Sequence, residues 1–177
     1  MPSPWYIPLD KKLLNVRQIT LFGVLAAMTF GAKVAMSYLP NIEPVTLFLL
    51  VFGAVFGWRG IFIAYTYVAA EILFYGLGLW NINYLYIWLV PVLAGWGLRR
   101  MENPLLWAAV SGAFGLLFGA VGAPVDLCIG GVGYAVSKWI SGIPFDLAHG
   151  FGNFVLTGLL LTPLRRLTQR LYQGIVR

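Results

Sequence analysis

Hydrophobic residues occur along the chain in long runs that are separated by short polar segments. A helix needs roughly 20 mainly apolar residues to cross a bilayer, within a range of about 17 to 25. Six runs approach or reach this length, at residues 19–39, 45–58, 61–79, 85–98, 105–123 and 143–164. The second and fourth runs are short, so we expect them to extend into flanking residues or to cross a locally thinner region. The pattern predicts an all-α membrane protein, a bundle of six transmembrane helices.

Composition agrees with this pattern. Hydrophobic residues make up 60% of the 177 residues and charged residues only 10%, whereas about 25% of the residues in a soluble domain are charged. We therefore expect a single integral domain, residues 1–177, embedded in a lipid bilayer. One cysteine excludes an intrachain disulfide, and one histidine excludes a metal site built from several histidines. We expect neither a metal nor a cofactor.

The positive charges predict the orientation of the helices. Ten of the twelve Lys and Arg residues fall on one side of the predicted bundle: Lys11, Lys12, Arg17, Arg59, Arg99, Arg100, Arg165, Arg166, Arg170 and Arg177. Lys33 and Lys138 fall on the other side. Because cytoplasmic loops carry an excess of Lys and Arg, both termini are predicted to be cytoplasmic. The net charge of +6 is then a signal of topology, and we expect no nucleic-acid partner.

A polar stripe marks the start of the last predicted span. Pro144 suits the first turn of a helix. Asp146, His149 and Asn153 follow it at spacings of three and four residues, which puts them on one helical face. The stripe predicts one wall of an outward-facing pocket, with Asn153 deepest. Two alternatives stay open: Asp146 as a helix cap, and His149 as an interior histidine with its hydrogen bonds satisfied.

Two ionisable residues lie inside other predicted spans. Lys33 is in the outer half of the first span and Glu71 is near the middle of the third. A charge in the bilayer costs at least ~2.5–3.5 kcal/mol, so each should face protein or water. We expect them to belong to the pocket, with Lys33 paired to Glu71 or Asp146; the alternative is an ion pair that only fixes helix packing. Glu43, in the first outer loop, is a further candidate for the pocket.

Aromatic and amide side chains are dense around the second outer loop. A flat organic ligand is held by stacking on ring faces and by hydrogen bonds at its rim. Trp and Tyr also gather at membrane interfaces without any ligand, which is the alternative. The candidate ligand-binding residues of this rim are Tyr75, Trp80, Asn81, Asn83, Tyr84 and Trp88.

Small residues recur every four positions in the first predicted span, at Gly23, Ala27, Gly31 and Ala35. Such a ridge lets another helix approach closely. The ridge is explained either by packing inside the bundle or by a partner helix outside it.

The chain lacks the recognised catalytic and nucleotide-binding motifs. It has no Walker motif, so active transport would have to draw energy from a partner. We expect no enzymatic activity of the chain itself. A small intramembrane enzyme built on Asp146, His149 and Glu71 is one alternative. A solo proton-coupled carrier that uses Glu71 and Lys33 is the other.

Two motifs and the ridge together resemble a known family. The motifs are Leu39-Pro-Asn-Ile-Glu-Pro-Val-Thr46 and Trp139-Ile-Ser-Gly-Ile-Pro-Phe-Asp146, the latter followed by His149 and Gly152-Asn153. With six short spans, they make nearly the whole chain resemble the substrate-binding S components of energy-coupling factor (ECF) vitamin transporters, which are related to ABC transporters.

The resemblance implies a function in the bacterial cell membrane. Such S components bind a vitamin or related micronutrient from outside, and they dock on a transmembrane coupling subunit that carries two cytoplasmic ATPases. Docking uses an Ala-x-x-x-Ala motif, filled here by Ala27 and Gly31, where glycine is a mild departure that keeps the surface smooth. The segments expected to cover the ligand are 38–44, 76–83 and 122–142. Cobalamin or a corrinoid precursor is the first substrate expected; riboflavin, folate, pantothenate and pyridoxine-like compounds stay open.

Overall fold

The computed structural model describes residues 14–39 and 41–176. Within them the chain is helical, with short connections and no strand, as predicted. The helices are α1 (Val16–Ala35), α2 (Val45–Phe56), a 3₁₀ turn (Gly57–Arg59), α3 (Gly60–Tyr75), α4 (Trp80–Ile87), α5 (Leu89–Gly97), α6 (Pro104–Leu116) and α7 (Phe118–Val176). Lys11, Lys12 and Arg177, which entered the predicted orientation, lie outside the described residues.

Three helical stretches are long and apolar enough to cross a membrane. Within residues 14–39 and 41–176 they are Val16–Ala35, Val45–Tyr75 and Pro104–Gly174. The six separate spans expected from the sequence are not what the helices show. The predicted spans 45–58 and 61–79 join through the 3₁₀ turn, and the predicted span 85–98 is divided between α4 and α5. Hydropathy counts apolar residues, and it does not register a break such as the one between α4 and α5, which falls at the apolar Trp88.

The largest difference from the sequence prediction concerns residues 122–142. They were expected to form a glycine-rich loop, and Pro124 was expected to end the fifth span. They are instead helical within α7, except at Gly131, where φ is 74° and ψ is −176°. Pro124 and Pro144 lie inside the helix, which membrane helices tolerate because neighbouring groups satisfy the freed backbone atoms. The glycine alone reverses the chain, because a positive φ suits a residue without Cβ.

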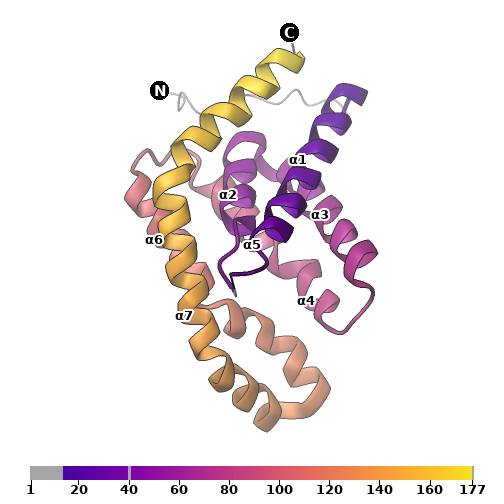
Figure 1. Ribbon diagram of the computed structural model, residues 1–177, viewed down its shortest axis with the longest axis vertical. Helices are drawn as coiled ribbons and strands as arrows, with labels where there is room; N and C mark the ends of the chain where they lie inside the picture. Colours follow the sequence, from indigo (N-terminus) through magenta and orange to yellow (C-terminus); the bar gives the residue numbers. More distant parts are fainter. Residues whose placement is uncertain (1–13, 40, 177) are drawn as a thin grey trace.

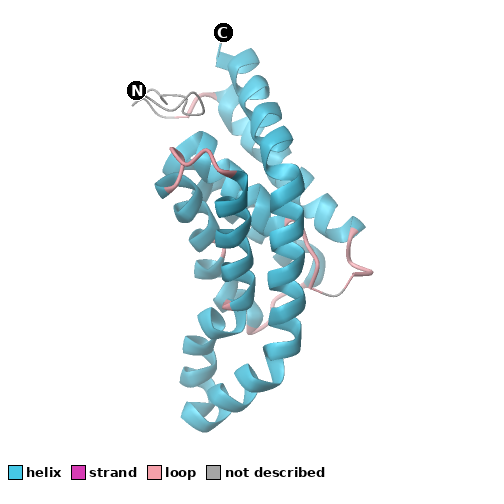
Figure 2. Cartoon of the chain, turned by 90° about the vertical axis from the view of Figure 1, so that its left-hand side faces the viewer, coloured by secondary structure: helices cyan, strands magenta, loops and turns pink. Residues whose placement is uncertain are grey.

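The helices run back and forth along the molecule. Figure 1 shows that the start of α1, the turn between α2 and α3, the connection between α5 and α6, and the end of α7 all lie in the upper half. The connections α1–α2 and α3–α4 and the reversal inside α7 lie in the lower half. In both views the limb of α7 that follows Gly131, residues 132–176, extends along the length of the molecule (Figure 2). The arginine-bearing segments 57–59 and 98–103 therefore share one end.

Two helix crossings without intervening side chains hold the bundle together. At the first, a Cβ added to Gly53 of α2 would overlap the Val92 carbonyl of α5, and one added to Gly95 would overlap the Leu50 carbonyl. At the second, a Cβ on Gly115 of α6 would lie 2.7 Å from the backbone nitrogen of Gly150 in α7. Close approach of this kind replaces the hydrophobic effect as the source of helix association in a bilayer.

The α1 ridge does not form such a crossing. A Cβ added to Gly23 or Gly31 meets no atom within 4 Å, and Ala27 and Ala35 are exposed. Packing inside the described bundle therefore does not explain the ridge.

The contrast between these glycines predicts opposite effects of one substitution. Gly95→Ala is expected to lower the stability by about 1–3 kcal/mol, because α2 and α5 must separate to admit the methyl group. Gly23→Ala is the matched control and is expected to leave stability unchanged or to raise it slightly, because alanine favours a helix. Thermal unfolding of the detergent-purified variants measures both. Equal melting temperatures for the two variants would contradict the close crossing.

Candidate functional site

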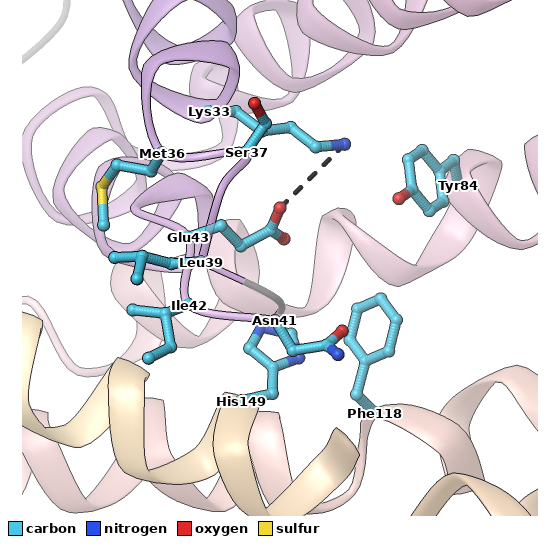
Figure 3. Close-up of a pocket in the computed structure, with 10 residues that line it drawn as sticks. All are labelled: Lys33, Met36, Ser37, Leu39, Asn41, Ile42, Glu43, Tyr84, Phe118 and His149. Carbon is cyan, nitrogen blue, oxygen red and sulfur yellow. Dashed lines mark ion pairs between the residues drawn. The ribbon is translucent and has the colours of Figure 1, made fainter.

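A polar hollow of about 280 Å³ opens where α1, the α1–α2 connection, α4 and α7 meet. Ten residues line it: Lys33, Met36, Ser37, Leu39, Asn41, Ile42, Glu43, Tyr84, Phe118 and His149. Figure 3 shows the Lys33 ammonium and the Glu43 carboxylate pointing toward each other, with Tyr84 across the hollow and Phe118 and His149 below. Most of the charged and polar groups are contributed by helix ends and by the connection, where the backbone leaves space.

Lys33 is held by Glu71 and by aromatic rings. Its Nζ lies 2.6 Å from Glu71 Oε2 and 5.5–6.0 Å from the ring centroids of Tyr67, Tyr75 and Tyr84. Ring faces attract an ammonium group at this separation. Glu71 is only 1% exposed and Lys33 is 19% exposed. The predicted pairing of Lys33 with Glu71 is confirmed, and the pair joins α1 to α3.

Glu43 is the carboxylate of this cluster that faces the hollow. Its Oε2 lies 4.0 Å from Lys33 Nζ, and Lys33 is already bonded to Glu71. Burial raises the pKa of Glu43 to about 7; Lys33 opposes this shift and the nearby Glu71 adds to it. Near neutral pH this carboxyl group therefore exists in both protonation states.

An aromatic hollow of about 440 Å³ adjoins the polar one. Tyr84 and Phe118 line both hollows, so the two share a wall. The remaining lining residues are Trp80, Asn83, Ile87, Gly119, Gly122, Asp126, Lys138, Trp139, Ser141, Gly142 and Phe145. The side chains on the α7 side come from both of its limbs, so the hollow exists because the chain reverses at Gly131.

Two polar contacts fix the α7 hairpin beside this hollow. Lys138 forms an ion pair with Asp126 across the two limbs. The backbone N–H of Gly119 donates to both carboxylate oxygens of Asp146, at 3.1 and 3.2 Å. Asp146 is thus neither a helix cap nor a partner of Lys33. It is a buried carboxylate that is tied to the limb opposite its own.

His149 lacks a hydrogen-bond partner in the described part of the chain. It is 4% exposed, its Nε2 is buried without a partner, and its ring meets Phe118 edge-on at 4.8 Å. An unsatisfied buried polar atom costs about 1–3 kcal/mol. The described residues therefore supply no partner for this nitrogen, which leaves it available to a ligand.

Several residues predicted for the site have other surroundings. Asn153 was expected to be the deepest group of the wall, but its side-chain nitrogen donates to Thr46 Oγ1 and to the Ser111 carbonyl between helices. Asn81 accepts from the Gly78 N–H and shapes the α3–α4 turn. Trp88 is 1% exposed and packs in the core. A helical or loop position identifies a face, but not which neighbour covers that face.

Other residues of the site were not identified from the sequence. Phe118 lines both hollows, and Tyr67 brings its ring to Lys33. Both belong to apolar runs and carry no sequence signal that separates them from lipid-facing aromatics. Asn41 lines the polar hollow with a positive φ of 57°; the Pro-Asn step of the first motif was the available hint.

Comparison of the chain with protein-family models, with curated proteins and with solved structures finds no match. The function of the chain must therefore be inferred from the geometry of the site and from the pattern of its sequence.

The buried ion pair predicts an asymmetric response to removal of either partner. Lys33→Met is expected to destabilise the protein by about 3–5 kcal/mol, because it leaves Glu71 buried beside a second carboxylate. Glu71→Gln should lower the stability by less, because Glu43 remains near Lys33 as a carboxylate that can balance its charge. The double variant Lys33→Met/Glu71→Met should recover part of the loss. Thermal unfolding in detergent measures the stability of the two single variants and the double variant. If the loss in the double variant equals the sum of the two single losses, Lys33 and Glu71 do not interact as a pair.

The raised pKa of Glu43 predicts a pH dependence of stability. The folded protein keeps a proton that the unfolded chain releases between about pH 4.5 and 7, so stability should fall as pH rises through this window and then level off. The groups facing Glu43 are Lys33 from α1, Tyr67 and Glu71 from α3, Tyr84 from α4 and His149 from α7. Glu43→Gln should flatten this part of the profile, whereas the control Glu102→Gln, at the opposite end, should not. Melting temperatures from pH 5 to pH 8 measure the difference.

Proposed function

We propose that this chain is the substrate-binding S component of an ECF-type transporter in a bacterial cell membrane. It binds a vitamin-like micronutrient in the two adjoining hollows. It delivers the ligand through a transmembrane coupling subunit that carries two cytoplasmic ATPases. The chain itself hydrolyses no ATP in this proposal.

The α1 ridge is the observation that carries the proposal. Ala27, Gly31 and Ala35 are exposed, and neither Gly23 nor Gly31 has an atom within reach of an added Cβ. The glycine crossings that the bundle does use lie elsewhere, between α2 and α5 and between α6 and α7. A smooth helical face that no described part of the chain covers supports docking of a helix from another subunit.

In this proposal the chain makes six passes with both termini in the cytoplasm. The chain reverses between α1 and α2, at the 3₁₀ turn, between α3 and α4, between α5 and α6, and around Gly131. The reversals that carry Arg59, Arg99 and Arg100 share one end with the start of α1 and the end of α7 (Figure 1). That end is the cytoplasmic one by the positive-inside rule. The hollows then open toward the outside, where a nutrient arrives.

The size of the hollows supports a compact ligand. Small-molecule sites span about 300–1,000 Å³, and the hollows measure about 280 and 440 Å³. A corrin ring with its side chains is a bulky molecule for such a space. We therefore place single-ring or fused-ring vitamins before cobalamin, the substrate first expected from the sequence.

The ridge gives a direct test. Ala27→Trp and Gly31→Trp are expected to abolish assembly with the coupling subunit and ATPases of the host, because an indole prevents close helix approach. Ligand binding by the purified chain should remain, because Ala27 and Gly31 are exposed and line neither hollow. Leu159→Trp, at another exposed apolar position, is the control. Co-purification and nutrient uptake in cells measure assembly, and unchanged uptake in the ridge variants would refute the proposal.

Assays of the purified chain separate the alternatives. Turnover of a substrate by the purified chain alone would favour the intramembrane enzyme. The Asp146 carboxylate is bonded to the Gly119 backbone, which weakens the case for it as a catalytic partner of His149. Flux in proteoliposomes without ATPases would favour the solo carrier.

A further inference from the structure

We infer that the two hollows form one bipartite site for a compact, flat heteroaromatic molecule with net positive charge. Its cationic group lies at Glu43 in the polar hollow, and its ring lies beyond Tyr84 and Phe118 in the aromatic hollow. This inference rests on the proposed function and specifies the chemical class of its ligand.

The distribution of charge is the first argument. The chain has a net charge of +6, yet four of its six acidic residues surround the hollows. Glu43 and Asp126 line them, while Glu71 and Asp146 bond to lining residues. Among the described residues, the ammonium groups that lie near these four carboxylates are those of Lys33 and Lys138. The surroundings of the site thus have an excess of two negative charges when all groups are ionised.

The pairing of these groups shows which carboxylates carry the excess negative charge. Lys33 is bonded to Glu71, and Lys138 is paired with Asp126. Glu43 is left with a cation that another carboxylate already holds, and Asp146 has only a backbone donor among the described residues. A ligand cation would complete the set at Glu43. An anionic ligand would have to compete with Glu71 for Lys33.

An unpartnered atom of the polar hollow gives independent support for a ligand. His149 Nε2 is buried and has no hydrogen-bond partner among the described residues. His149 lines the hollow itself and is 4% exposed. A protonated amine or a ring N–H of the ligand could donate a hydrogen bond, and the unprotonated nitrogen of a neutral imidazole could accept it.

The aromatic walls select the shape and reinforce the charge preference. Tyr84 and Phe118 stand between the hollows, and Trp80, Trp139 and Phe145 line the larger one. Ring faces stack on a flat heteroaromatic group, and their quadrupoles attract positive charge. Within the protein, three tyrosine rings already surround the Lys33 ammonium in this way.

A set of ligands that share one ring but differ in charge tests the inference. The purified full chain is titrated with pyridoxamine, pyridoxine and 4-pyridoxic acid, which share a pyridine ring and carry an aminomethyl, a hydroxymethyl or a carboxylate group. Thiamine is included as a second cationic heteroaromatic. Binding is followed by thermal shift and by quenching of tryptophan fluorescence. We expect at least one of the two cations, pyridoxamine or thiamine, to bind. If pyridoxamine binds, its affinity should be at least tenfold higher than that of pyridoxine or 4-pyridoxic acid.

Two variants locate the charge preference. Glu43→Gln should weaken binding of the cation at least tenfold and leave the affinity for a neutral analogue unchanged. Glu102→Gln, which removes an acidic residue at the opposite end, should change neither. Equal loss for cationic and neutral probes in Glu43→Gln would overturn the placement at Glu43.

The remaining outcomes also decide the inference. Binding of neither cation overturns it, and so does tighter binding of a neutral or anionic probe, or a corrinoid found by native mass spectrometry of the purified protein. A tightly bound neutral or anionic vitamin would still leave the proposed S component in place. Uptake that does not need the ATPases would remove the proposed function, whatever the charge of the ligand.

Discussion

The buried ion pair between Lys33 and Glu71 is the interaction on which the polar half of the molecule depends. Each residue alone would place a charge in an apolar helix at a cost of at least ~2.5–3.5 kcal/mol. Their pairing at 2.6 Å joins α1 to α3 and draws three tyrosine rings around the ammonium group. Because Lys33 is already bonded, Glu43 faces the hollow without a cation of its own, and this unequal pairing defines the electrostatics of the site.

Close packing elsewhere makes the open space possible. Glycines bring the backbone of α2 against α5 and that of α6 against α7 without intervening side chains. The bundle is held at those crossings, so the ends of α1 and α4 and the hairpin of α7 need not fill every gap. The α1 ridge has the same small residues, but its glycines have no neighbour within reach in the described part of the chain. One kind of residue thus serves two purposes, tight internal crossings and a smooth exposed face.

Part of the site was visible in the sequence. The rarity of charge in apolar runs marked Lys33 and Glu71, and the helical spacing of Asp146 and His149 marked the face of α7 that turns inward. Asn153 and Trp88 met the same criteria, yet Asn153 bonds to Thr46 and Ser111 and Trp88 lies in the core. Phe118 met none of them and lines both hollows. Local pattern identifies polar or amphipathic positions, whereas cavity walls depend on contacts between distant segments.

The sequence by itself determined the helical, membrane-compatible character of the chain, because long apolar runs leave the backbone no other way to satisfy its hydrogen bonds in lipid. It also determined which charges had to find partners. Only the tertiary structure decided that Lys33 pairs with Glu71, that residues 122–142 form a helical hairpin around Gly131, and that the glycines of α1 remain uncovered. These outcomes depend on which helices meet and how closely. A linear pattern does not contain that information, since packing partners lie tens of residues apart.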